Sequence, residues 1–274
     1  MSSLMQRLLT AVVLIPVVVW VVLYAAETTF LTVLSGIIFI AAYEWAMLSG
    51  VKGRPQKLMV AFFVLVFANG LLGLDAQLLT YLMLLSLVFW LLVIMFIILM
   101  PEYLLNMQRQ PLVTMLLLVG VLLSLTYLAM FQLRHAFSQG ADLLMYLLLL
   151  IWIADSGAYF AGRALGMHKL SAIISPGKSI EGVAGGLLSC LLFAVFVAGY
   201  FEVSNAAGFI CLSLLVVIVS VYGDLFESLL KRRANVKDSG NILPGHGGVL
   251  DRIDSLIAAA PVFCASLLLL GMFI

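Results

Sequence analysis

The chain has 274 residues, of which 65% are hydrophobic and only 10% are charged, and its formal net charge is +1. This composition is too apolar for a soluble globular domain, and the balanced charge excludes a broad electrostatic field that would attract nucleic acid. The three cysteines lie in apolar runs without the spacing of metal ligands, so no cysteine metal site is indicated. The sequence therefore predicts an integral membrane protein.

Continuous apolar runs follow one another along the chain, each close to the 20 residues or so that a helix needs to cross a bilayer. A transmembrane β-barrel would instead show alternating segments of about ten residues. The first run shows no signal-peptide cleavage site, so we expect it to remain as a helix. We predict an all-α polytopic membrane protein with nine transmembrane helices, near residues 8–25, 28–48, 58–74, 78–100, 111–133, 142–165, 183–201, 209–230 and 253–273.

Lys and Arg accumulate in the cytoplasmic loops of membrane proteins, so their distribution orients the chain. If the N-terminus is cytoplasmic, nine spans place every Lys and Arg except Arg134 on the cytoplasmic side. Loops 166–182 and 231–251 then face the cytoplasm, and the C-terminus is external. Arg134 and the neighbouring His135 lie on the other face, and we assign them no role.

The residues that could carry chemistry are unevenly distributed along the chain. Residues 1–141, with the first five predicted spans, contribute length and hydrophobicity but no motif, so we expect them to form a scaffold. Residues 142–274 contain the last four spans and both charged loops. We expect the catalytic region in this second part.

The sixth predicted span carries Asp155 well inside an apolar helix, where a carboxylate is costly and is by default a functional candidate. The next loop contains the segment SPGKSIEG, which supplies four polar residues: Ser175, Lys178, Ser179 and Glu181. The segment lacks the glycine spacing of a Walker A loop, but its hydroxyls, its ammonium group and the following helix N-terminus could bind phosphate. The alternative is an ordinary polar loop in which Ser179 caps the helix.

The eighth predicted span carries four polar residues on one helical face: Asp224, Glu227, Ser228 and Lys231. At a rise of 1.5 Å per residue, Asp224 lies about 10 Å farther into the membrane than Lys231. A simple pair between Glu227 and Lys231, four residues apart, is the plainer alternative, but it leaves Asp224 unexplained.

A glycine-rich turn, PGHGGVLDRID, comes directly before the ninth span. Gly247 and Gly248 would let backbone N–H groups approach a phosphate, and His246 could add a donor. Asp251 and Asp254 follow, and simple capping of the ninth helix is the alternative explanation for them. Carboxylates from neighbouring helices, together with phosphate oxygens, are the usual way in which proteins hold Mg²⁺.

These motifs resemble the signature of the phosphatidate cytidylyltransferases, also called CDP-diacylglycerol synthases. The matching run comprises Ser228-Leu-Leu-Lys-Arg, Lys237-Asp238, Pro244-Gly-His-Gly-Gly and Asp251-Arg252-Ile-Asp254. The segments DSGAY and SPGKSIEG also resemble that family. The resemblance implies that CTP condenses with phosphatidate in the membrane to give CDP-diacylglycerol and pyrophosphate, with Mg²⁺ required. It also implies a bacterial inner-membrane protein, with its active site on the cytoplasmic face and with a homodimer as its plausible assembly.

The residues and the resemblance together define a candidate site. We expect Asp224 and Asp251 to be the main Mg²⁺ ligands, with a second cation left open. The supporting ligands are expected to be Asp155, Glu227 and Asp254. The catalytic set is completed by Lys231, Lys237, His246 and Arg252. We expect the substrates to be bound by Ser175, Lys178, Ser179, Glu181, Ser228, Arg232, Gly247 and Gly248.

Two other functions remain as alternatives. A CTP-dependent polyprenol kinase would transfer the γ-phosphoryl group of CTP to a lipid alcohol. An ion-coupled transporter would use the intramembrane carboxylates to bind cations. The CDP-alcohol phosphotransferases are set aside, because their aspartate motif has longer spacing than Asp251 and Asp254 provide.

Overall fold

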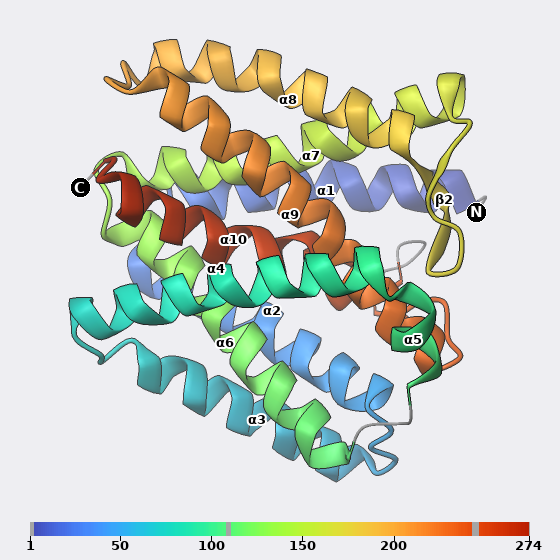
Figure 1. The fold of residues 1–274 in the computed structure, drawn as a ribbon. Coiled ribbons are helices and arrows are strands. Elements are labelled where there is room, and N and C mark those ends of the chain that lie inside the picture. The colour runs from blue at the N-terminus through green and yellow to red at the C-terminus, as the bar shows by residue number, and fades with distance from the viewer. Residues whose placement is uncertain (1–2, 108–110, 243–246, 274) are drawn as a thin grey trace.

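Long helices build the protein, as a computed structural model shows (Figure 1). The structure describes residues 3–107, 111–242 and 247–273. The helices are α1 (Ser3–Leu23), α2 (Glu27–Leu48), α3 (Arg54–Leu71), α4 (Ala76–Leu99), α5 (Pro101–Asn106), α6 (Leu112–His135), α7 (Gly140–Leu165), α8 (Ile180–Tyr200), α9 (Ala206–Arg233) and α10 (Leu250–Leu270). Two short strands, β1 (Lys169–Ser171) and β2 (Ser175–Ser179), pair antiparallel between α7 and α8.

Each of the nine predicted spans falls on one of these helices, and the expected all-α polytopic membrane class is confirmed. Within the described residues, seven helices are long and apolar enough to cross a bilayer: α2, α4, α6, α7, α8, α9 and α10. Helices α1 and α3 lie where the first and third spans were expected. The count of nine spans and the orientation in the membrane stay predictions. The short helix α5 and the β-hairpin were not predicted.

Capping groups mark where several helices begin. The Asp75 carboxylate accepts the N–H of Leu78 at 2.9 Å at the start of α4, and the Ser179 hydroxyl accepts the N–H of Gly182 at 3.1 Å at the start of α8. Pro101 lies in the first turn of α5, where a missing N–H costs no hydrogen bond. The cap at Ser179 fixes the point at which the hairpin becomes helix α8.

Helix α10 lies in the middle of the bundle (Figure 1), and residues 255–267 are all buried. A helix that is apolar and buried on all sides belongs to the core of a bundle. It packs against α9, α6 and α4. Because Asp251 and Asp254 lie in its first turns, part of the predicted site is carried by a firmly packed helix.

Helices α7 and α8 approach closely because small residues line their contact. A Cβ atom at Gly186 would lie 2.7 Å from the carbonyl oxygen of Ala154, and one at Gly182 would lie 2.9 Å from that of Ala158. Such small residues allow transmembrane helices to pack backbone against backbone. The tight pair holds Asp155 on α7 close to the hairpin that leads into α8.

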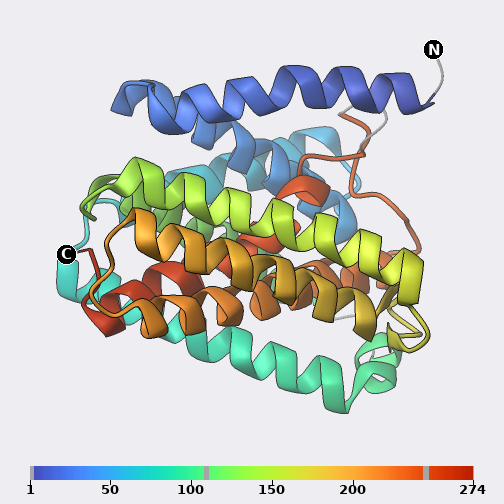
Figure 2. The ribbon, with the colours of Figure 1, turned by 90° about the horizontal axis from the view of Figure 1, so that it is seen from above.

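The β-hairpin and α5 lie near one end of the bundle, whereas the chain end that follows α10 lies at the other (Figure 1 and Figure 2). The hairpin is fastened by a small group of buried apolar residues from α4, the hairpin turn and α9: Ile97, Ile174, Leu225 and Leu229. The hairpin is therefore packed against the last turns of α9, which carry the charged face predicted from the sequence.

Candidate functional site

Lys231 on α9 lies between two carboxylates, and we call Glu227, Lys231 and Asp251 the lysine bridge. The Lys231 ammonium pairs with Glu227 and lies 2.7 Å from Asp251 Oδ1. The side chains of Lys231, Glu227 and Asp251 are only 12%, 2% and 6% exposed, respectively. Buried charges are tolerated when they are paired with each other in this way. The pair between Glu227 and Lys231 that the spacing suggested is present, and Asp251 joins it from the next helix.

Asp251 also ties the loop that precedes α10. Its Oδ2 accepts the backbone N–H groups of Ser239 at 2.9 Å and of Gly248 at 2.8 Å. The contact with Gly248 holds the turn just before α10, whereas the N-cap residue of the helix, Val249, has no side-chain cap. Gly247, with a φ of 85°, adopts a left-handed conformation that favours glycine. Because the N–H of Gly248 is used within the protein, phosphate binding by Gly247 and Gly248 stays a prediction.

Lys178 and Asp224 link the hairpin to α9. The Lys178 ammonium lies 2.7 Å from Asp224 Oδ2 and also donates to the carbonyl oxygen of Val221 at 3.3 Å. The Ser228 hydroxyl donates to Asp224 Oδ1 at 3.2 Å. The side chains of Lys178 and Asp224 are 26% and 29% exposed, so this pair is more open than the lysine bridge. The structure thus brings together the two charged segments that the sequence singled out.

Three helices that contact one another, α7, α9 and α10, each carry an aspartate, and we call Asp155, Asp224 and Asp254 the acidic cluster. The charges of Asp224 and Lys178 act on both Asp155 and Asp254. In the described part of the chain, ion pairs reach Asp224 but neither Asp155 nor Asp254. Oxygen donors of this kind suit a hard divalent cation. In the present side-chain arrangement of the described residues, however, no three acidic, histidine or cysteine side chains converge closely enough to hold a metal ion.

The other hairpin residues have structural contacts. Glu181 accepts the backbone N–H groups of Met167 and His168 and lies 2.6 Å from His168 Nδ1, so it holds the loop before β1. Ser179 caps α8, as the plainer alternative proposed, and Ser175 begins β2. The expected roles of these residues in substrate binding stay predictions.

The remaining basic residues surround the same end of α9. Arg232 donates from Nε to the carbonyl oxygen of Ile174 at 3.4 Å, which again joins α9 to the hairpin turn. Lys237 and Arg252 are exposed. His246, which we expected to contact phosphate, lies outside the described residues.

Sequence reasoning missed Glu44 on α2. This carboxylate is 1% exposed and accepts hydrogen bonds from the backbone N–H groups of Val249 and Leu250 and from the Ser239 hydroxyl. A lone acidic residue in the apolar run 28–48 was the available signal, because buried carboxylates in membrane helices are rare. The first 141 residues therefore contact the loop between α9 and α10, residues 234–249, which we call the signature loop.

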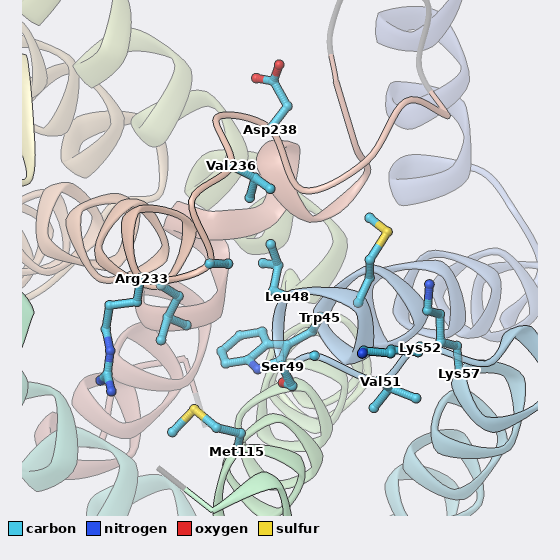
Figure 3. Close-up of a pocket in the computed structure, with 14 residues that line it drawn as sticks. Trp45, Leu48, Ser49, Val51, Lys52, Lys57, Met115, Arg233, Val236 and Asp238 are labelled. Carbon is cyan, nitrogen blue, oxygen red and sulfur yellow. The ribbon is translucent and has the colours of Figure 1, made fainter. Parts of the chain in front are cut away.

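A cavity of about 510 Å³ opens beside Trp45, the neighbour of Glu44. Its walls include Met115 from α6 and Leu230 from α9. Lys52 and Lys57 lie on one side of Trp45 and Arg233 lies on the other (Figure 3). The cavity thus combines apolar walls with basic groups, next to the segment that contains the signature residue Asp238.

Comparison with known proteins decides the family. Residues 5–270 match the sequence model of the cytidylyltransferase family. The chain belongs to this family. It is 37% identical over 282 residues to the phosphatidate cytidylyltransferase of Haemophilus influenzae, an alignment that covers 94% of this chain and 96% of that protein. The phosphatidate cytidylyltransferase of Pseudomonas aeruginosa is 39% identical over 267 residues, with 96% of each chain covered.

A third cytidylyltransferase is similar over a shorter stretch. The phosphatidate cytidylyltransferase of Bacillus subtilis is 41% identical over 147 residues, which cover 53% of this chain and 54% of that protein. The family resemblance that we inferred from the motif run between Ser228 and Asp254 is confirmed by these matches.

Proposed function

We propose that this chain condenses CTP with phosphatidate to give CDP-diacylglycerol and pyrophosphate. The observation that carries the proposal is that two charged groups lie at one end of the helix bundle. These groups are the pair of Lys178 with Asp224 and the lysine bridge. The names of the similar proteins from Haemophilus influenzae and Pseudomonas aeruginosa support it. A bacterial inner-membrane location, a cytoplasmic active site and a homodimer belong to the same proposal.

Phosphatidate provides its own nucleophile. A phosphate monoester has a second pKa near 6, so most of the lipid phosphate is a dianion at neutral pH and no general base is required. A phosphatidate oxygen attacks the α-phosphorus of CTP, the bond from that phosphorus to the bridging oxygen of the β-phosphate breaks, and pyrophosphate leaves with the electron pair. The protein must therefore bring two polyanions together and neutralise their charge.

The donor set fits Mg²⁺, although its side chains do not converge in this arrangement. Asp155, Asp224 and Asp254 would hold the ion, which would neutralise charge on the α-phosphoryl group and the departing pyrophosphate. Glu227 and Asp251 were also expected as ligands from the sequence. Their contacts with Lys231 favour a different role, in which both residues hold this cation. Asp251 also holds the loop before α10.

The basic residues bind and orient the substrates in this proposal. Lys178, which pairs with Asp224 of the acidic cluster, and the exposed Lys237 and Arg252 would contact phosphate groups of CTP and phosphatidate. Arg232 is bonded to the hairpin turn and would keep Lys178 in place. Lys237 and Arg252 are exposed, so a water-soluble nucleotide or a membrane lipid would meet their side chains at the protein surface.

The direct test supplies purified protein with phosphatidate, Mg²⁺ and CTP labelled at the α-phosphate. We expect the label to enter the lipid while unlabelled pyrophosphate is released. Entry of label only from γ-labelled CTP would instead show a lipid kinase. Absence of any nucleotide-dependent product in active vesicles, together with cation-driven uptake, would support a transporter and contradict the proposal.

A further inference from the structure

Glu44 is a buried carboxylate whose partners come from a distant part of the chain. It lies on α2, and its oxygens accept the N–H of Val249 at 3.1 Å, the N–H of Leu250 at 2.8 Å and the Ser239 hydroxyl at 3.3 Å. The side chain has no ion pair in the described part of the chain. Its negative charge is therefore compensated by hydrogen bonds alone.

These hydrogen bonds complete the N-terminus of α10. The first N–H groups of a helix have no partner within that helix, and the helix dipole makes this end electropositive. Val249, the residue before the first turn, offers no side-chain cap. Glu44 supplies the missing acceptor from another helix, and the electropositive helix end in turn stabilises the buried carboxylate.

The loop before α10 is shaped to fit around Glu44. A Cβ atom on Gly240 or on Gly248 would overlap the Glu44 carboxylate, so a larger residue at either position would displace this carboxylate from its hydrogen bonds. Ser239 is held from two sides, because its backbone N–H donates to Asp251 and its hydroxyl donates to Glu44. Glu44 therefore contacts both described ends of the loop, near residue 240 and near residue 248.

We propose that Glu44 is a positioning residue for the cytidylyltransferase reaction. It holds the two ends of the signature loop together and thereby places Lys237 on one side, and Asp251 and Arg252 on the other, where they meet the substrates. The scaffold region thus contributes an essential contact to the site. The effect on catalysis rests on the proposed function, whereas the effect on the loop does not.

The first experiment replaces Glu44 by Gln, which keeps the shape of the side chain and removes its charge. We expect kcat/KM to fall on the order of 100-fold, since a displacement of about 1 Å at a catalytic group costs that much. The exposed Glu102 on α5 provides the matched control, and Glu102→Gln should remain within twofold of the unmodified protein. Thermal unfolding in detergent checks that both variants are folded.

The second measurement follows the loop itself and needs no activity. A cysteine at the exposed Asn241 is labelled with a water-soluble maleimide, in a background in which the exposed Cys211 is replaced by Ser. We expect Glu44→Gln to accelerate labelling at position 241 several-fold, because the loop is released. Labelling of a cysteine at Ala172, at the exposed turn of the hairpin, should not change.

A third test changes the contact between Glu44 and the loop by substituting a loop residue, Gly240. Gly240→Ala adds a methyl group that overlaps the Glu44 carboxylate, so we expect at least a tenfold loss of activity. In the Glu44→Ala background the overlap is gone, and Gly240→Ala should cause no further loss. Such non-additivity is expected for residues that are in contact or belong to one hydrogen-bond network.

The outcomes separate the two proposals. If the unmodified protein makes no CDP-diacylglycerol, the proposed function fails, and the labelling experiment still decides whether Glu44 holds the loop. If Glu44→Gln changes neither kcat/KM nor the labelling rate, the positioning role is wrong. If Glu44→Gln does not fold, Gly240→Ala with Glu44 intact decides instead, and unchanged activity in that variant overturns the proposal.

Discussion

The lysine bridge and the acidic cluster are neighbouring groups of charged residues with opposite character. The lysine bridge is almost fully buried, and its Lys231 contacts both of its carboxylates. In the acidic cluster Asp155 is exposed and Asp254 is partly buried, and neither has an ion pair among the described residues. In the lysine bridge one largely buried cation joins two carboxylates, whereas carboxylates without an ion pair among the described residues are suited to bind a cation.

The largest expected effect on activity is at Asp224, the residue of the acidic cluster that forms an ion pair with Lys178. Asp224→Asn keeps the size of the side chain but removes the charge that would hold Mg²⁺ and that pairs with Lys178. We expect activity to fall at least 100-fold, measured as CTP-dependent pyrophosphate release. Asp142→Asn, at the predicted external end of α7, is the control and should retain activity. A loss below threefold at Asp224 would remove it from the cation site.

Substitutions of the two lysines should have different effects: Lys231 should affect mainly the stability of the protein, and Lys178 mainly substrate binding. Lys231→Met leaves two buried carboxylates without their cation, so we expect it to destabilise the protein by about 3–5 kcal/mol. Lys178→Met removes a more open cation and should cost much less stability while raising KM for CTP. Thermal unfolding and steady-state kinetics on both variants test this. Equal losses of stability would show that the two groups do not differ as proposed.

Lys237 should show a smaller and purely electrostatic effect. This side chain is exposed, so Lys237→Ala should leave unfolding unchanged and should raise KM more than it lowers kcat, by about tenfold at low salt. The difference from the unmodified protein should shrink as ionic strength rises. A fall in kcat without a change in KM would place Lys237 in the chemical step instead.

The smallest effect is expected at Glu181. Its carboxylate holds the loop around His168 but is not part of the lysine bridge or the acidic cluster. We expect Glu181→Gln to lower activity by roughly two- to threefold, because surface substitutions away from a site are usually mild. The same pyrophosphate assay measures it. A loss as large as that at Asp224 would show that Glu181 contacts substrate.

Local patterns predicted the helices and most of the charged end of the bundle. Apolar runs of about 20 residues located every long helix, and the spacing from Asp224 to Lys231 placed four polar residues on one face of α9. The hairpin was not predicted, because strands of three and five residues leave no clear alternating pattern. Glu44 was missed for a different reason. Its position in an apolar run marked it as unusual, but its partners lie about 200 positions away in the chain, and one sequence does not reveal such a pairing.

The sequence could not distinguish the two groups of carboxylates either. It grouped Asp251 with Asp224 as Mg²⁺ ligands because one loop joins the two neighbouring helices that carry them. The structure shows that the Asp251 oxygens contact Lys231, Ser239 and Gly248. Hydrogen-bond partners of this kind are set by packing between helices, and residue spacing alone does not reveal them.

The division between the lysine bridge and the acidic cluster is tested most directly by the Mg²⁺ requirement of two variants measured side by side. Asp224→Asn and Asp251→Asn are compared by pyrophosphate release over a series of Mg²⁺ concentrations. We expect Asp224→Asn to raise the Mg²⁺ concentration for half-maximal activity at least tenfold, and Asp251→Asn to lower the maximal rate while leaving that concentration within twofold. An equal rise in both variants would contradict the division and would make Asp251 a metal ligand.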